Sequence, residues 1–413
     1  LGYNQPSLLP IFLPWLVQIR RIRLMNDRFA TGISVSRVPA TRWIVLLCLL
    51  TAVLLLTGCA LEEISSADIQ PIEQVQTDED DDYYYTETAE DCWEDEEFDE
   101  VDQLCYPVVY CDEEGICEEE EYGFLDLLFG LVDELVWGVA GGGFEDAADL
   151  EESTLITYRV EENQIVEPEL AAVTDDLVGF QSDTEAHQKI WVYFARLVPP
   201  EQRPYLTKYV IFTDGPEEVL AFVTPDTDDP TKWLLGVDIA DTSNPEELTF
   251  TLIHEFAHLL TLNSGQVPVN EALALEPDNE ELYEAAATAC PVYFPGEGCS
   301  EPTSYINAFY ERFWADIYEE WSEIDALQYE DEDEYATGLE EFYAEREDEF
   351  VSDYATTSPE EDIAESFATF VLKPKPTGET LADEKVAFFY DYPELVKLRA
   401  EMSGRLYSRL RRR

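Results

Sequence analysis

The fold is decided by the stretch NPEELTFTLIHEFAHLLTL, residues 244–262. Its start, Ser243-Asn244-Pro245-Glu246-Glu247, combines a cap residue, a proline suited to the first turn and two acids near the positive end of a helix dipole. Asn263-Ser264-Gly265 supplies a stop signal. The pattern therefore predicts a helix over 245–262, with apolar residues on both sides of 254–258.

Within this helix, His254 and His258 lie one turn apart on one face, so both imidazoles can reach one metal ion. Glu255 is placed to take a proton from a water molecule at that ion. The chain has three histidines, and the other one, His187, precedes the motif on a separate predicted helix. We therefore expect an aspartate or glutamate as the third ligand of one Zn²⁺ per chain, with an open fourth position.

Candidates for that third ligand lie in YATTSPEEDIAESF, residues 354–367. Ser358-Pro359 is a helix start. On the helix that follows, Glu361 and Glu365 share a face one turn apart. The stretch thus offers two carboxylates to the histidine pair.

Together, HEFAH and Tyr-x6-Glu-x3-Glu resemble the gluzincin metallopeptidases, the group that includes the lethal factor of anthrax toxin. The pattern is more similar still to bacterial zinc-binding metallopeptidases that are secreted as lipoproteins. The resemblance covers about 208–241, 245–265 and 350–372. It implies a zincin fold and hydrolysis of peptide bonds in a protein or peptide substrate. It also implies three roles: Glu361 as zinc ligand, Glu365 as support of a ligating histidine, and Tyr354 as a contact of the reaction's oxyanion.

Two of these assignments have simpler alternatives. Ser358-x-x-Glu361 is also a capping box, in which Glu361 only bonds the start of its helix. For Tyr354, the alternative is an ordinary packed tyrosine. At the level of function, the alternative to a peptidase is a catalytically silent zincin-fold surface lipoprotein that acts as a binding or assembly module.

The surrounding pattern predicts an α+β domain over 153–413. Residues 184–197 have helical spacing, and three segments rich in β-branched and aromatic residues follow as strand candidates, namely 208–213, 219–224 and 233–240. We expect a zincin-like domain with a small mixed sheet, the active-site helix and a helical C-terminal part. An insertion at about 266–350, with acidic helical residues 304–343, separates the two motifs.

The N-terminal region 1–58 is typical of a secretory signal, with translation starting at Met25. Basic residues precede the apolar run 44–56, and the end of this run forms the sequence Leu56-Thr57-Gly58-Cys59 with the three residues that follow. These four residues resemble the bacterial lipobox and imply lipidation of Cys59. We expect a protein attached to the cell membrane by its lipid and facing the extracellular or periplasmic side. A single-pass anchor is the alternative, although the run is shorter than the roughly 20 residues of a comfortable span.

Residues 59–152 are expected to form an acidic tether with one apolar helix candidate, 124–140. Six cysteines remain outside the signal and the lipobox: Cys92, Cys105, Cys111, Cys117, Cys290 and Cys299. Such cysteines in an exported chain favour disulfides. Cys290 with Cys299 closes a Pro/Gly-rich loop and is the expected pair. Zinc binding by the other four is the alternative, but no CxxC spacing supports it.

The composition of the chain limits which functions it can have. The 413 residues include 91 acids and 24 basic residues, a formal net charge of -67. Such a chain repels phosphate backbones, which excludes nucleic-acid binding as the expected function. With 46% hydrophobic residues, the chain has enough apolar side chains for a substantial core.

Overall fold

The computed structural model describes residues 96–99, 104–107, 153–215, 219–277, 279–329 and 331–411. The chain divides into two units: one is 26–85, and the other combines 1–25 with 86–413. Every described residue belongs to the unit that includes 86–413. Outside the described residues lie the predicted signal region, Met25, Cys59 and the apolar segment 124–140. Within the described parts of the chain, no helix combines the length and the apolarity that a membrane span needs.

A five-stranded mixed sheet forms the first half of the domain, in the order β4-β3-β5-β7-β6. Its strands are β3 (Thr154–Glu161), β4 (Gln164–Leu170), β5 (Leu206–Phe212), β6 (Ala221–Pro225) and β7 (Trp233–Asp238). β5 and β7 are parallel, and the other neighbours are antiparallel. The sheet and the helices beside it form the mixed α+β architecture that the sequence predicts.

The three predicted strands correspond to β5, β6 and β7, whereas β3 and β4 are additional. β4 is an edge strand whose residues are mostly exposed and whose apolar residues do not alternate with polar ones, so it lacks the pattern that identifies a half-buried strand. A separate antiparallel pair, β1 (Glu96–Asp99) and β2 (Leu104–Pro107), lies inside the predicted tether. No strand was expected there, because acids dominate the first of the two segments.

The centre of the sheet is buried on both faces. On one face, Trp191 of α6 (Thr184–Leu197) packs on Tyr209 of β5, with 5.2 Å between ring centroids. The opposite face carries a cluster of buried apolar residues, Val210, Phe212, Val219, Phe222 and Leu234. A slip by one residue would exchange the side chains that pack on the two faces, so their different shapes help to specify the strand register.

Gly236 of β7 allows the edge strand β6 to lie where it does. A Cβ atom added at Gly236 would lie 2.2 Å from Cε1 of Phe222, its partner on β6. Only a residue without a side chain leaves room for that ring. β6 pairs with β7 along Ala221–Pro225 and contributes to the site described below.

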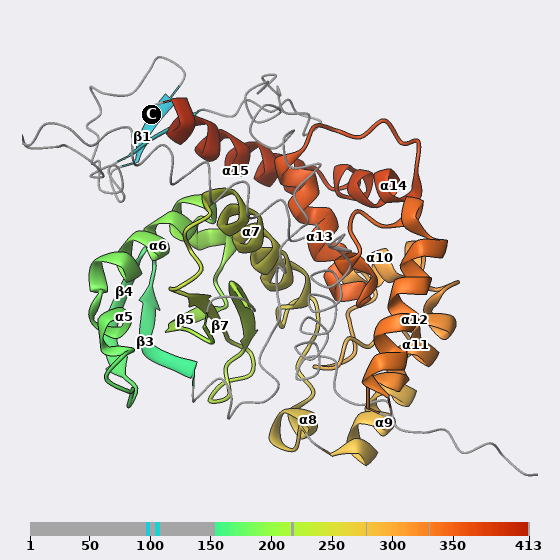
Figure 1. The fold of residues 1–413 in the computed structure, drawn as a ribbon. Helices are drawn as coiled ribbons and strands as arrows, with labels where there is room; N and C mark the ends of the chain where they lie inside the picture. Colours follow the sequence, from blue (N-terminus) through green and yellow to red (C-terminus); the bar gives the residue numbers. More distant parts are fainter. Residues whose placement is uncertain are drawn as a thin grey trace, which may run out of the picture. The chain divides into compact units, whose positions relative to one another are not determined.

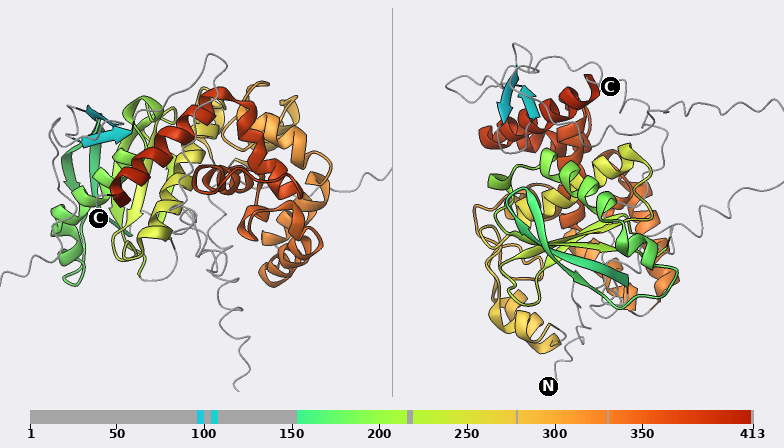
Figure 2. Two further views of the ribbon diagram at one scale, coloured as in Figure 1. Left: turned by 90° about the horizontal axis from the view of Figure 1, so that it is seen from above. Right: turned by 90° about the vertical axis from the view of Figure 1, so that its left-hand side faces the viewer.

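Helices form the second half of the domain (Figures 1 and 2). They are α8 (Glu271–Leu275), α9 (Glu280–Ala289), α10 (Tyr305–Phe309), α11 (Tyr318–Asp325), α12 (Glu332–Glu345), α13 (Pro359–Leu372), α14 (Leu381–Phe388) and α15 (Pro393–Arg411). A π-helical turn, Tyr310–Trp314, follows α10. α13 packs against α7 (Pro245–Leu262) and so joins the helical half to the sheet half.

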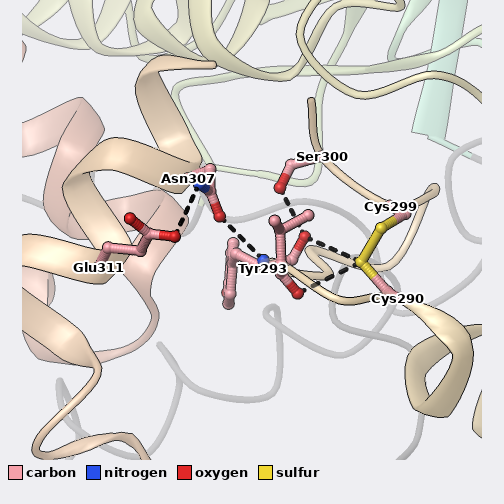
Figure 3. Close-up of a disulfide and its surroundings, with 7 residues drawn as sticks. Cys290, Tyr293, Cys299, Ser300, Asn307 and Glu311 are labelled. Atoms are coloured by element: carbon pink, nitrogen blue, oxygen red, sulfur yellow. Dashed lines mark hydrogen bonds between the residues drawn. A yellow bond between two sulfur atoms is a disulfide. The ribbon is translucent and has the colours of Figure 1, made fainter. Parts of the chain in front are cut away.

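Cys290 and Cys299 form the disulfide that the sequence favours, with 5.4 Å between their Cα atoms (Figure 3). Tyr293 lies within the loop that they close, and its backbone bonds residues outside the loop. Its backbone N–H donates to Oδ1 of Asn307 at 3.0 Å, and its carbonyl accepts from Oγ of Ser300 at 2.6 Å. The disulfide loop is therefore tied to α10 of the insertion.

The tryptophans of the insertion lie in the core and also bond to the second motif. Nε1 of Trp321 donates to the backbone carbonyl of Thr356 at 3.0 Å. Nε1 of Trp314 donates to a carboxylate oxygen of Asp362 at 2.8 Å. The insertion therefore packs directly on the segment that carries the predicted third ligand.

The basic C-terminal helix α15 supplies hydrogen-bond donors to the C-terminal end of α13. The Arg399 guanidinium donates to the backbone carbonyls of Phe370 and Lys373. Oγ of Ser403 donates to the Val371 carbonyl at 2.9 Å. These donors satisfy carbonyls that a helix end leaves without partners, and the positive charge suits the negative end of the dipole.

Candidate metal centre

Helix α7 is built as its sequence predicts. The Asn244 side chain accepts the backbone N–H groups of Glu246 and Glu247 at 3.1 and 3.4 Å, which caps the start of the helix. At the other end, Nδ2 of Asn263 donates to the carbonyls of Leu259 and Leu260 at 2.8 and 3.0 Å. A helix that is fixed at both ends holds the histidine pair rigidly.

Helix α13 supplies the carboxylates. Oγ of Ser358 accepts the backbone N–H of Glu361 at 3.2 Å, so the serine half of the predicted capping box is present. The Glu361 carboxylate lies against the histidine pair, with Oε2 3.0 Å from Nε2 of His254. Phe367 packs edge-on against Phe256 of α7, with 6.0 Å between centroids, and fixes the two helices against each other.

Three ligand atoms converge in this interface. Nε2 of His254 lies 3.0 Å from Nε2 of His258, and Oε2 of Glu361 lies 3.0 and 3.5 Å from these two nitrogens. Tetrahedral zinc with bonds of 2.0–2.1 Å separates its ligand atoms by about 3.3 Å. All three side chains are buried, and the group could hold a metal ion. The residues thus fit a small divalent cation in both spacing and chemistry.

The described residues contain a second group of possible ligands, Asp214, Asp238 and Asp241. It differs in kind, because Asp214 is exposed and Asp241 is half-buried. Asp238 uses both carboxylate oxygens to accept backbone N–H groups, those of Asp214 and Ala240. The Asp238 carboxylate therefore joins the end of β5 to the turn that precedes α7.

Hydrogen bonds within the site favour a charged pair between His254 and Glu361. Burial alone lowers the pKa of His254, but the hydrogen bonds to Glu361 and Glu365 outweigh it and raise this pKa to about 10. Burial raises the pKa of Glu361, but the adjacent His258 and His254 bring it to about 2. Burial lowers the pKa of His258. A cation that binds here must therefore displace a proton from His254.

Glu365 lies on the opposite side of the His254 ring from Glu361. Its Oε1 is 2.8 Å from Nδ1 of His254, and its Oε2 accepts from Oγ of Ser352 at 2.7 Å. The two ring nitrogens point in different directions, so a carboxylate on Nδ1 cannot ligate a metal on Nε2. Glu365 instead orients the imidazole, a role common around histidine ligands.

Glu255 lies beside the ligands and has one oxygen held and one free. Oε2 accepts the backbone N–H of Val223, on the edge strand β6, at 2.8 Å. Oε1 is buried and has no hydrogen-bond partner in the described structure. Burial raises the pKa of Glu255 to about 8, with smaller effects from the nearby charged groups. A buried carboxylate with a free oxygen and a raised pKa is suited to accept and return a proton.

Tyr354 lies at the same site. It begins the short 3-10 helix η6 (Tyr354–Thr356) that leads into α13, and its side chain is half-buried. The centroid of its ring is 6.0 Å from that of His254. The structure therefore brings together Tyr354, Glu255, Glu361 and the two histidines.

Sequence reasoning missed two contributors, Ser352 and Val223. Val223 acts through its backbone N–H, which almost any residue could supply, so its side chain carries no signal. Ser352 lies two residues before Tyr354, in a segment without periodic spacing. The third histidine, His187, is not part of the site; its Nδ1 bonds Tyr158 at 2.8 Å and its Nε2 bonds the Phe180 carbonyl at 2.8 Å.

The arrangement joins a possible metal position to an adjacent proton acceptor and a nearby phenol. These are the parts needed for hydrolysis assisted by a metal. A comparison of the chain with protein family models, with curated proteins and with solved structures finds no match.

Proposed function

We propose that this chain is a zinc-dependent peptidase with a zincin fold of the gluzincin type. The observation that carries the proposal is the convergence of two imidazole nitrogens and one carboxylate oxygen within 3.5 Å of one another. Beside them lies Glu255, a buried carboxylate with an oxygen that has no hydrogen-bond partner among the described residues. The resemblance of HEFAH and the second motif to gluzincins agrees with this geometry.

Zinc is the metal that we propose for the group. Two imidazoles and one carboxylate form a donor set that suits several first-row metals, among them iron. The positioned carboxylate of Glu255 favours a metal used for hydrolysis over one used for oxidation. Elemental analysis of the purified protein tests this choice directly, with one zinc per chain as the expected result.

The chain's own residues would divide the chemistry as follows. Bound zinc would supply Lewis acidity to the scissile carbonyl and to water. Glu255 takes a proton from the attacking water and returns it to the leaving amine. Tyr354 donates a hydrogen bond to the oxygen that becomes negatively charged. Glu365 keeps the His254 ring in the orientation that ligation requires.

For location, we propose that the domain is attached to a membrane through a lipid on Cys59 and faces away from the cytoplasm. This follows from the signal-like region 1–58 and the acidic segment 59–152 as a spacer. Replacing Cys59 with Ser should abolish lipid labelling and release or mislocalise the protein. A variant that stays in the membrane with its signal uncleaved would identify 44–56 as an anchor instead.

The decisive experiment is Glu255→Gln, assayed on an unfolded protein substrate with and without a chelator. Gln can still accept the Val223 N–H and leaves all three proposed ligands in place. We expect one zinc per chain and a loss of hydrolysis of about 10²–10⁴-fold, the usual contribution of a general base. Glu281→Gln, an exposed change on α9, serves as the control and should behave as wild type.

Two results would contradict the peptidase proposal. Wild-type protein that binds zinc but cleaves nothing, with or without chelator, would favour the silent binding module. Hydrolysis that survives both chelation and Glu255→Gln would mean that another site catalyses the reaction.

A further inference from the structure

The first turn of α13 contains three consecutive acids, Glu360, Glu361 and Asp362, and all three are buried, at 3%, 1% and 0% exposure. A buried carboxylate without a partner is strongly unfavourable. Successive helix residues point about 100° apart, because a turn takes 3.6 residues. Each acid therefore faces a different neighbour, and each needs its own partner.

The two outer acids have partners on the helical half of the domain. Oε1 of Glu360 accepts from the Tyr293 hydroxyl at 2.7 Å, inside the disulfide loop. Oδ2 of Asp362 lies 2.6 Å from Nζ of Lys385, on α14. The Lys385 side chain is itself completely buried. The middle acid, Glu361, faces the histidine pair.

Lys385 contacts a second segment as well. Its Nζ lies 3.6 Å from the centroid of the Phe350 ring, a cation–π contact. Phe350 precedes Ser352 by two residues, and Ser352 donates to Glu365. One ammonium group thus contacts both segments that shape the site: α13 through Asp362, and 350–354 through Phe350.

From this geometry we propose that Lys385 is a positioning residue of the metal centre, acting from outside it. Its charge neutralises Asp362 and fixes the first turn of α13, so that the adjacent Glu361 presents its carboxylate to His254 and His258. Its contact with Phe350 holds the segment that carries Ser352. The proposal rests on the proposed function, because it assumes that the histidine pair and Glu361 bind zinc.

Without the ammonium group, Asp362 would remain buried with a charge that the hydrogen bonds from Trp314 and Ser366 only partly offset. The first turn of α13 would then shift to bring that carboxylate toward water. Glu361 is the preceding residue on the same rigid turn, so its carboxylate would move with it. A metal site tolerates such movement poorly, because its ligands must be held to within about 0.5 Å.

The test is Lys385→Met, which keeps an unbranched side chain, one atom shorter, and removes its charge. We expect the dissociation constant for Zn²⁺, measured by competition with a chromophoric chelator, to rise by about 10–100-fold. We also expect an altered visible spectrum of the Co²⁺-substituted protein, since this spectrum reports ligand geometry. The matched control is Val386→Ala, a buried neighbour on α14 that should lower thermal stability and leave metal affinity and spectrum unchanged.

A double variant tests whether Lys385 acts on the metal site through Asp362. Lys385→Met with Asp362→Asn removes both charges, and the amide oxygen of Asn can still accept from Trp314. Zinc affinity should return to within a few-fold of wild type. If the double variant binds zinc as weakly as Lys385→Met, charge balance at Asp362 is not the route and the proposal fails.

The outcomes separate the two proposals. Wild-type protein that binds no zinc would overturn the proposed function. Wild-type protein that binds zinc, together with a folded Lys385→Met of equal affinity and identical Co²⁺ spectrum, would overturn the positioning role alone. Should Lys385→Met fail to fold, Phe350→Leu carries the test: a folded variant with weakened zinc binding supports the proposal, and one with wild-type binding overturns it.

Discussion

Replacing Glu365 with Ala tests whether His254 depends on a carboxylate behind it. The change removes the acceptor 2.8 Å from Nδ1 of His254 and the partner of the Ser352 hydroxyl. It leaves Glu361 and its contacts with both Nε2 atoms in place. We therefore expect zinc to bind, but more weakly.

The size of the expected loss in zinc affinity follows from the hydrogen bond that His254 loses. The His254 ring is fully buried, so no bulk water can replace the lost carboxylate. Partners of this kind behind a ligating histidine typically contribute about 10–100-fold to metal affinity, which corresponds to about 1.4–2.7 kcal/mol. Glu365→Gln keeps an acceptor for Nδ1 and should fall at or below the lower end of that range.

Isothermal titration or chelator competition with Zn²⁺ measures these affinities. Ser352→Ala should have a smaller effect than either Glu365 variant, because neither bond that it removes reaches His254: Oγ donates to Glu365 and accepts the backbone N–H of Ala355 at 3.1 Å. Ser403→Ala is its control: this buried serine bonds the Val371 carbonyl, at the other end of α13. The reasoning is refuted if Glu365→Ala empties the site while Glu361→Ala retains zinc, since Glu365 would then be the ligand.

Three further changes have defined outcomes. Tyr354→Phe should preserve zinc content and substrate binding but slow turnover, by about 2.7–4 kcal/mol if the hydroxyl is the oxyanion donor, as steady-state kinetics would show. Gly236→Ala should lower the free energy of unfolding by about 1–3 kcal/mol, because the new methyl group overlaps the Phe222 ring; denaturant titration measures this, and an unchanged midpoint would contradict it. Replacing Cys290 and Cys299 together with Ala opens a loop with a sequence separation of 9 and should lower stability by about 2.6 kcal/mol on the chain-entropy model, with calorimetry as the check.

The parts of the site that the sequence predicts are those encoded by local spacing. The two histidines of HEFAH are four residues apart, and this spacing alone places them on one face of the helix α7. Glu361 and Glu365 share a face of α13 in the same way. Recognising both motifs required only that each segment be helical, and their caps at Asn244 and Ser358 ensured this.

The parts that escaped prediction depend on contacts between distant segments. Within a single sequence, Ser352 is one serine among many, and only the packing of its segment on α13 brings it to Glu365. Lys385 is likewise an ordinary basic residue until α14 places it against Asp362. Motif spacing identified Glu361 and Glu365, but which of them faces Nε2 depends on how α13 is rotated against α7.

The charges inside the site favour binding of a cation. Glu255, Glu361 and Glu365 are buried together, and one proton on His254 offsets only part of their charge. Burial also raises the pKa of Glu255 to about 8, so additional negative charge is unfavourable in this interior. A divalent cation bound to Glu361 and both histidines would take over this compensation. The proton on Nε2 of His254 would leave, and Glu255 would be freer to ionise beside a positive charge. The same ion that completes the site would thereby prepare its base.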